Sequence, residues 1–139
     1  MILVDKDRKI LVVRRGSVLT KNVRFDGTIV AGISCSFLGN VEGYEVKLSK
    51  HCTVGGIVRC TRAIVGACSE FNVIEAEDVI LLRGCRGKRI YATGDVKVAS
   101  NCIIGEIYAG RNLVIEGNSK IGKMEARRIV AVNDQNAFI

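Results

Sequence analysis

The cysteines are the residues best equipped for chemistry in this sequence, because thiols form disulfides and bind soft metal ions. Five of the six share one register, each following the last at a nearly constant interval: Cys35, Cys52, Cys68, Cys85 and Cys102. Ser119 continues the series one interval later. We expect the five cysteines to stack in one column, where adjacent sulfurs could form a disulfide or share a soft metal ion.

The spacing argues against both reactions. It is unlike the C-x-x-C pairs of zinc and redox sites. A column also places its ligands along a line, whereas tetrahedral zinc needs four ligands around a point. Cysteine is small and apolar enough to fill a tight corner of a fold. We therefore interpret the column as packing with reduced thiols, and we predict no metal and no cofactor.

Catalytic chemistry has one candidate residue, His51, the only histidine in the chain. A Ser/His/Asp or Cys/His arrangement would need it. It lies beside Cys52 at an expected corner, and we interpret it as an exposed corner residue. The sequence predicts neither an enzyme nor a small-molecule substrate.

Charge and composition exclude several classes of protein. The net charge of +7 permits attraction to anionic surfaces, and four basic residues cluster at Arg83, Arg86, Lys88 and Arg89. With 5% aromatic residues none interleave with this cluster, so we interpret it as solubilising and predict no specific nucleic-acid partner. The absence of Pro argues against disordered linkers, and the short apolar runs fall far below the length of a membrane-spanning helix. We expect a cytoplasmic protein, with membrane association left open.

The cysteine interval belongs to a wider repeat. One column of small residues consists of Gly43, Cys60, Ala76, Ala92, Ala109 and Ala126. Three aliphatic columns consist of Leu48, Val65, Leu81, Val98, Ile115 and Ala131; of Val41, Ile57, Ile74, Ile90, Ile107 and Met124; and of Val46, Ala63, Val79, Val96, Leu113 and Ile129. At the N-terminus Val12, Ile29 and Val46 keep the same step, so the first turns are expected to begin near Lys9.

This repeat predicts an all-β solenoid. Apolar residues alternate within each unit, which indicates strands, and a unit of about 17 residues is too short for a two-helix repeat. Three short strands and three corners fit instead, giving one turn of a parallel β-helix. We predict a single domain over residues 1–139 with roughly eight turns, clearest over 35–132, and residues 133–139 as a C-terminal tail or end cap. The variable corners favour a right-handed helix over the left-handed type, which keeps a strict hexapeptide period.

Residues 101–130 carry a recognisable pattern. Cys102-Ile103-Ile104-Gly105-Glu106-Ile107-Tyr108-Ala109, then Leu113-Val114-Ile115-Glu116-Gly117, then Ile121-Gly122-Lys123-Met124, resemble the core repeat of bactofilins. A looser similarity extends back to about Gly27. The resemblance implies a right-handed β-helix that stacks end to end into non-polar filaments without nucleotide, sometimes on membranes, and serves as a scaffold. The chain departs from that family in lacking Pro-rich tails, in being basic and in its cysteine column, which puts membrane attachment in doubt.

The ends of a β-helix expose unpaired backbone and core, so they are candidate polymer contacts. The apolar residues available there are Ile2, Leu3, Val4, Phe138 and Ile139. The alternative is that these tails fold over the ends as plugs. An apolar stripe is also expected outside one wall, at Ile64, Ile80, Val114 and Val130, interrupted by Lys47 and Lys97. It would suit lateral packing against a neighbour or a membrane surface, or simply reflect strand propensity.

These observations together favour a structural protein that polymerises with itself, head to tail, into a cytoskeletal or scaffold filament. Two other classes remain open. One is a β-helical acyltransferase of the hexapeptide type or another enzyme subunit, for which a trimer with a substrate pocket would be evidence. The other is a monomeric binding module that presents its basic or aliphatic wall, for which steep salt dependence would be evidence.

Overall fold

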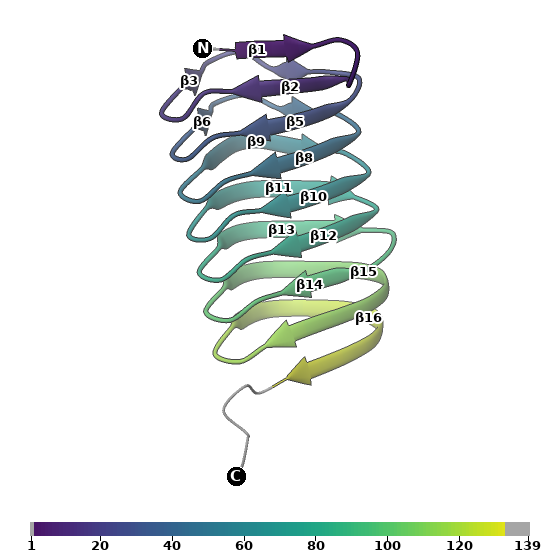
Figure 1. Cartoon of the computed structure of the whole chain (residues 1–139). Helices are drawn as coiled ribbons and strands as arrows, with labels where there is room; N and C mark the ends of the chain where they lie inside the picture. The colour runs from purple at the N-terminus through teal and green to yellow at the C-terminus, as the bar shows by residue number, and fades with distance from the viewer. Residues whose placement is uncertain (1, 133–139) are drawn as a thin grey trace.

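The computed structural model describes residues 2–132 and is a parallel β-helix of about seven turns (Figure 1). The strands nearest the viewer run to the left and those behind run to the right while the chain descends, so the helix is right-handed (Figure 1). Both the all-β class and the solenoid architecture predicted from the repeat are confirmed. The turn number is close to the expected eight.

All the described strands belong to one 16-stranded sheet that wraps around the axis. The strands are β1 Ile2–Asp5, β2 Ile10–Val13, β3 Val18–Leu19, β4 Val23–Arg24, β5 Thr28–Ala31, β6 Ser36–Phe37, β7 Val41–Glu42, β8 Glu45–Leu48, β9 Thr53–Arg59, β10 Arg62–Val65, β11 Glu70–Ala76, β12 Asp78–Leu81, β13 Arg86–Ala92, β14 Val96–Val98, β15 Ile103–Glu116 and β16 Lys120–Val132.

Register divides each turn into three walls. Wall A, which faces the viewer in Figure 1, contains β2, β5, β8, β10, β12, β14 and the last residues of β15 and β16. Wall B contains β3, β6 and the first residues of β9, β11, β13, β15 and β16. Wall C contains β4, β7 and the residues of the same long strands that follow wall B along the chain and precede wall A.

Alternation in the strands fills the tube with aliphatic side chains. In wall A, Val79 and Leu81 point inward and are 1% exposed, while Ile80 between them points outward. Inward residues of successive turns stack at about 4.8 Å, so each column forms a continuous ladder. The columns through Leu48, through Val46 and through Gly43 have the register that the sequence predicted.

The corner between walls A and B uses the same left-handed backbone in seven successive turns. The residues with positive φ there are Gly16, Ser34, His51, Cys68, Gly84, Asn101 and Asn118, with φ between 58° and 75°. Glycine and asparagine tolerate this conformation best, which accounts for four of the seven residues. The next residue in each turn points into the tube.

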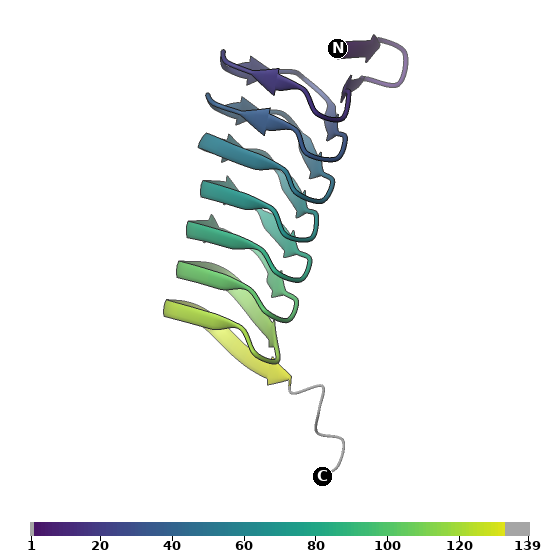
Figure 2. The ribbon, with the colours of Figure 1, turned by 90° about the vertical axis from the view of Figure 1, so that its left-hand side faces the viewer.

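The N-terminal segment differs from the prediction. Leu11, not Val12, shares the inward column with Ile29, because the first turn is one residue longer than the repeat indicates. The extra residue lies in the corner Phe25-Asp26-Gly27, which the next turn crosses with Gly43 and Tyr44. Before this turn the chain forms a hairpin in which β1 pairs with β2 in antiparallel fashion, at the top of the stack in Figure 2.

A second correction concerns the middle of the chain. Val58, which is 1% exposed, takes the inward position predicted for Ile57. The turn that contains β11 crosses the corner between walls B and C with Asn72 alone, where the preceding turn uses Gly55 and Gly56. The turn that is shorter by one residue therefore comes one turn later along the chain than the sequence spacing of the aliphatic column suggested.

Candidate assembly surfaces

The C-terminal turn exposes side chains whose neighbours in the preceding turn are buried. Ile107 and Leu113 in β15 are fully buried, whereas Met124 and Ile129, their direct neighbours in β16, are 42% and 46% exposed. Within residues 2–132, no strand pairs with the outer edge of β16. The last described turn therefore presents an open edge of backbone beside apolar side chains that have the pattern of a core.

The N-terminal end is different because β1 covers only wall A. Ile2 lies opposite Val13 and Val4 opposite Leu11, so both candidates share the inward face of wall A. Leu3 lies opposite Val12 on the outer face. All three candidate contacts are exposed, at 41%, 59% and 50% for Ile2, Leu3 and Val4. The other two candidates, Phe138 and Ile139, lie outside the described residues.

The outer face of wall A carries the predicted stripe. Ile64, Ile80, Val114 and Val130 occupy one column with Lys47 and Lys97, and register extends it to Val12 and Val30. The aliphatic members are partly exposed, and beside them an apolar hollow of about 480 Å³ includes Ile64, Ile80 and Val114 in its lining. The structure thus places all four lateral candidates together on one flat surface.

The cysteines do form a column, but its membership differs from the prediction. Cys68 lies one residue too early and is exposed at the left-handed corner. Ser69, which is fully buried, takes the inward place. The error has the same cause as that at Ile57, namely the short turn around Asn72. The observed column is Ser17, Cys35, Cys52, Ser69, Cys85, Cys102 and Ser119.

Each thiol or hydroxyl from Cys35 onward donates a hydrogen bond to a carbonyl of the preceding turn. The acceptors and distances are Arg14 at 3.0 Å, Gly32 at 3.2 Å, Ser49 at 3.1 Å, Gly66 at 3.2 Å, Leu82 at 3.3 Å and Ala99 at 2.8 Å. The serines also accept, because the N–H groups of Cys52 and Cys102 donate to Ser69 and Ser119. The column therefore satisfies corner carbonyls that the backbone ladder leaves free.

Two neighbouring thiols in this column differ in acidity. When Cys102 ionises, the Cys85 thiol can turn from the Gly66 carbonyl and donate to the thiolate, which lowers the pKa of Cys102. The same interaction, followed by burial, raises the pKa of Cys85. Both side chains are fully buried, so solvent reagents cannot reach the more acidic thiol in the folded chain. Within residues 2–132 no three His, Cys, Asp or Glu side chains converge as metal ligands.

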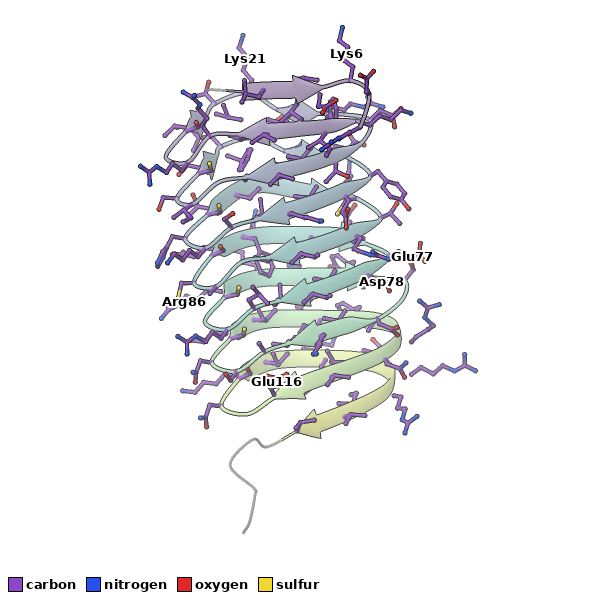
Figure 3. All side chains as sticks on the ribbon, in the orientation of Figure 1. Lys6, Lys21, Glu77, Asp78, Arg86 and Glu116 are labelled. Carbon is purple, nitrogen blue, oxygen red and sulfur yellow. The ribbon has the colours of Figure 1, made fainter. Side chains whose placement is uncertain are left out.

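The remaining candidates do not gather into one site. His51 is exposed at its corner with a φ of 60°. Arg83, Arg86, Lys88 and Arg89 are all exposed around the turn that contains β13, and Arg86 points away from the solenoid (Figure 3). Arg89 faces Glu106 at 3.8 Å. Among the described residues no helix has the length and apolar character needed to cross a bilayer.

The missed residues are those of the C-terminal turn, chiefly Met124 and Ile129. Their sequence signal is identical to that of buried column members, so periodicity predicts them inside. They differ from the buried members in that, among residues 2–132, no strand pairs with the outer edge of their own strand. Comparison with known proteins found no matching family model, no matching curated protein and no matching solved structure.

Proposed function

We propose that this protein is a structural subunit that self-assembles by end-to-end stacking of its β-helix. The observation that carries the proposal is the exposure of Met124 and Ile129 in positions that the turn just before them buries fully, at Ile107 and Leu113. A second solenoid stacked on β16 would give these side chains the environment that Ile107 and Leu113 have. No nucleotide enters this scheme, because stacking continues the fold itself.

Two forces would hold such a contact together. Burial of the exposed parts of Met124 and Ile129 contributes roughly 1 kcal/mol each. The free backbone edge of β16 adds hydrogen bonds wherever the partner presents a strand edge, as β1 does over wall A. Because a contact between unlike ends does not close into a ring, repetition produces a filament. With β1 lying between successive subunits, its axial repeat is about 43 Å, from the eight strands of wall A and β1 at about 4.8 Å each.

We infer a head-to-tail arrangement from the difference between the two ends. The outer edge of β1 and the edges of β3 and β4 face away from the stack at the N-terminal end. In a head-to-tail contact the last residues of β16 would meet β1 in antiparallel fashion over wall A. The resemblance to bactofilins supports the filament and its use as a scaffold, although it implies non-polar filaments. Image reconstruction that resolves subunit direction distinguishes the two arrangements.

The experiment is negative-stain electron microscopy with sedimentation velocity over a range of protein and salt concentrations. The wild type should form rods whose length grows with concentration. Met124→Lys should shorten or abolish them, because it places a charge in the stacked core. Leu38→Lys is the matched control, since Leu38 is 59% exposed at the corner between walls B and C, one turn inside the N-terminal end and far from β16. A wild type that stays monomeric under all conditions would contradict the proposal.

A further inference from the structure

The central outer column of wall A is palindromic. From the N-terminal turn to the C-terminal turn it is Val12, Val30, Lys47, Ile64, Ile80, Lys97, Val114 and Val130. The order of residue types is the same in both directions around a point between β10 and β12. A surface with this property matches itself when a second copy is related to it by a two-fold rotation.

The neighbouring outer column places opposite charges face to face at its centre under the same rotation. Arg62 in β10 and Asp78 in β12 lie on either side of the central point. The rotation places Arg62 of each copy opposite Asp78 of the other, so the pair forms twice. Arg62 is 58% exposed and Asp78 is 31% exposed, and Asp78 lies at the right-hand edge of wall A in Figure 3.

The two lysines have acidic neighbours at the same level of the stack. Lys47 lies 3.9 Å from Glu45, and Asp95 occupies the corresponding place beside Lys97. The rotation brings Lys47 opposite Lys97 of the other copy and Glu45 opposite Asp95. At each of these levels the two copies together contribute two lysines and two carboxylates, so the net charge is zero. Each lysine can then pair with the carboxylate that lies diagonally opposite on the other copy.

The third outer column contributes an apolar side chain near the centre. Leu82 follows β12 and is 44% exposed. The rotation places it opposite Gly66 of the other copy, a residue with no side chain to obstruct it. Leu82 thereby extends the apolar centre formed by Ile64 and Ile80.

We propose that the outer face of wall A is a homotypic docking surface that pairs two copies of this chain face to face with antiparallel solenoid axes. The two-fold axis runs parallel to the strands between β10 and β12. Ile64 and Ile80 of each copy pack against Ile80 and Ile64 of the other, and Arg62 pairs with Asp78. The pairing is independent of end-to-end stacking, because it uses no residue of either end turn at its centre.

The size of this face indicates how strong the pairing is. Eight strands at about 4.8 Å and five residues at about 3.3 Å give a surface of roughly 630 Å² for each copy. The total of about 1,300 Å² is near the lower limit for a specific interface. Single subunits should therefore pair weakly, and stacked subunits should pair firmly because their contacts add along the rod.

A charge exchange tests the pairing. Arg62→Asp and Asp78→Arg should each raise the dissociation constant for pairing about tenfold or more, because each places like charges opposite one another twice. The double variant should recover pairing, since it restores both cross-copy pairs, while within the chain it replaces the contacts of Arg62 with Glu45 and of Asp78 with Arg111 by like-charge contacts in both copies alike. Sedimentation equilibrium measures the constant, and a thermal melt verifies that each variant is folded. Unchanged pairing in both single variants, or failure of the folded double variant to recover, would overturn the proposal.

A second variant tests the apolar centre without altering any charge pair. Leu82→Glu should weaken pairing, whereas Leu38→Glu at a distant corner should not. Amine cross-linking of mixed ¹⁴N- and ¹⁵N-labelled chains gives the orientation. Mixed-isotope links should join Lys47 to Lys97, and links of Lys47 to Lys47 without the former would overturn the antiparallel arrangement.

Failure of pairing and failure of stacking are separable in the same images. Loss of pairing halves the width of the rods at unchanged length. Loss of stacking leaves short particles that are two solenoids wide only at high protein concentration, because single subunits pair weakly. The Met124→Lys variant should therefore retain mixed-isotope links between Lys47 and Lys97.

Discussion

The ring of Phe71 lies over the backbone of Gly87, its direct neighbour in the next turn of wall B. A Cβ atom on Gly87 would overlap three atoms of this ring. Phe71 is 5% exposed, so the ring is packed inside the tube. A large side chain in one turn is thus followed by a glycine in the next. Together the two residues fill the volume that two aliphatic residues fill in other turns.

This relationship predicts that Gly87→Ala is destabilising although alanine is small. The added methyl group must displace the ring, at a cost of about 1–3 kcal/mol. Phe71→Ala should cost about 3–5 kcal/mol through the cavity it leaves. Urea denaturation measures both changes. In the double variant Gly87→Ala/Phe71→Leu the two changes should be less than additive, and strict additivity would show that the ring and the Gly87 backbone are not in contact.

The sequence was sufficient for the fold because the inward columns are chemically uniform. Val46, Ala63 and Val79 repeat at nearly constant spacing, and a ladder of such residues has only one arrangement that buries them all. The corners were harder. Replacement of Gly55 and Gly56 by Asn72 alone shortens one turn, and nothing in the spacing of the cysteines locates that deletion. Register was therefore displaced by one residue at Ile57 and Cys68.

The assembly surfaces were predictable to different degrees. The outer stripe follows directly from alternation once the inward column is known, so Ile64 and Ile80 were placed correctly. The contact at the C-terminal turn was not, because Met124 has the same pattern as the buried Ile107. What separates them is the presence of a following turn, which is a property of the three-dimensional stack.

Ser69 is expected to contribute more stability than its size suggests. Its hydroxyl accepts from the N–H of Cys52 and donates to the carbonyl of Ser49, both at 3.1 Å. Ser69→Ala leaves both groups buried without a partner and should cost about 1–3 kcal/mol. Ser69→Cys should cost less, because cysteine occupies four places in the same column. The measurement is denaturant unfolding, with Ser119→Ala as the less buried control, and a neutral Ser69→Ala would contradict the role of the ladder.

The corrected register predicts a specific pattern of thiol reactivity. Cys68 is exposed, whereas Cys35, Cys52, Cys85 and Cys102 are fully buried. A maleimide reagent at pH 7 should modify Cys68 within minutes and the four buried thiols only after denaturation. Peptide mass mapping over time assigns the sites. Rapid modification of Cys102 in the folded chain would show that its acidic thiol is accessible to solvent and that the column is open.

Cys60 predicts how stability depends on alkaline pH. Burial raises its pKa from 9.0 to about 12, so above pH 9 the unfolded chain releases this proton while the folded chain retains it. The stability contributed by the protonated thiol is complete below pH 9 and is lost as pH rises toward 12.

Comparison with Cys60→Ala isolates this effect, because alanine occupies the equivalent position in the following turns at Ala76, Ala92 and Ala109. Between pH 8 and pH 10.5 the wild type should lose about 2 kcal/mol more unfolding free energy than the variant. Tyrosine and lysine titrations are common to both chains and cancel in the difference. Urea denaturation at several pH values gives the two curves. Parallel curves would mean that the folded chain ionises Cys60 as readily as the unfolded chain, and the corner between walls C and A would then be open to water.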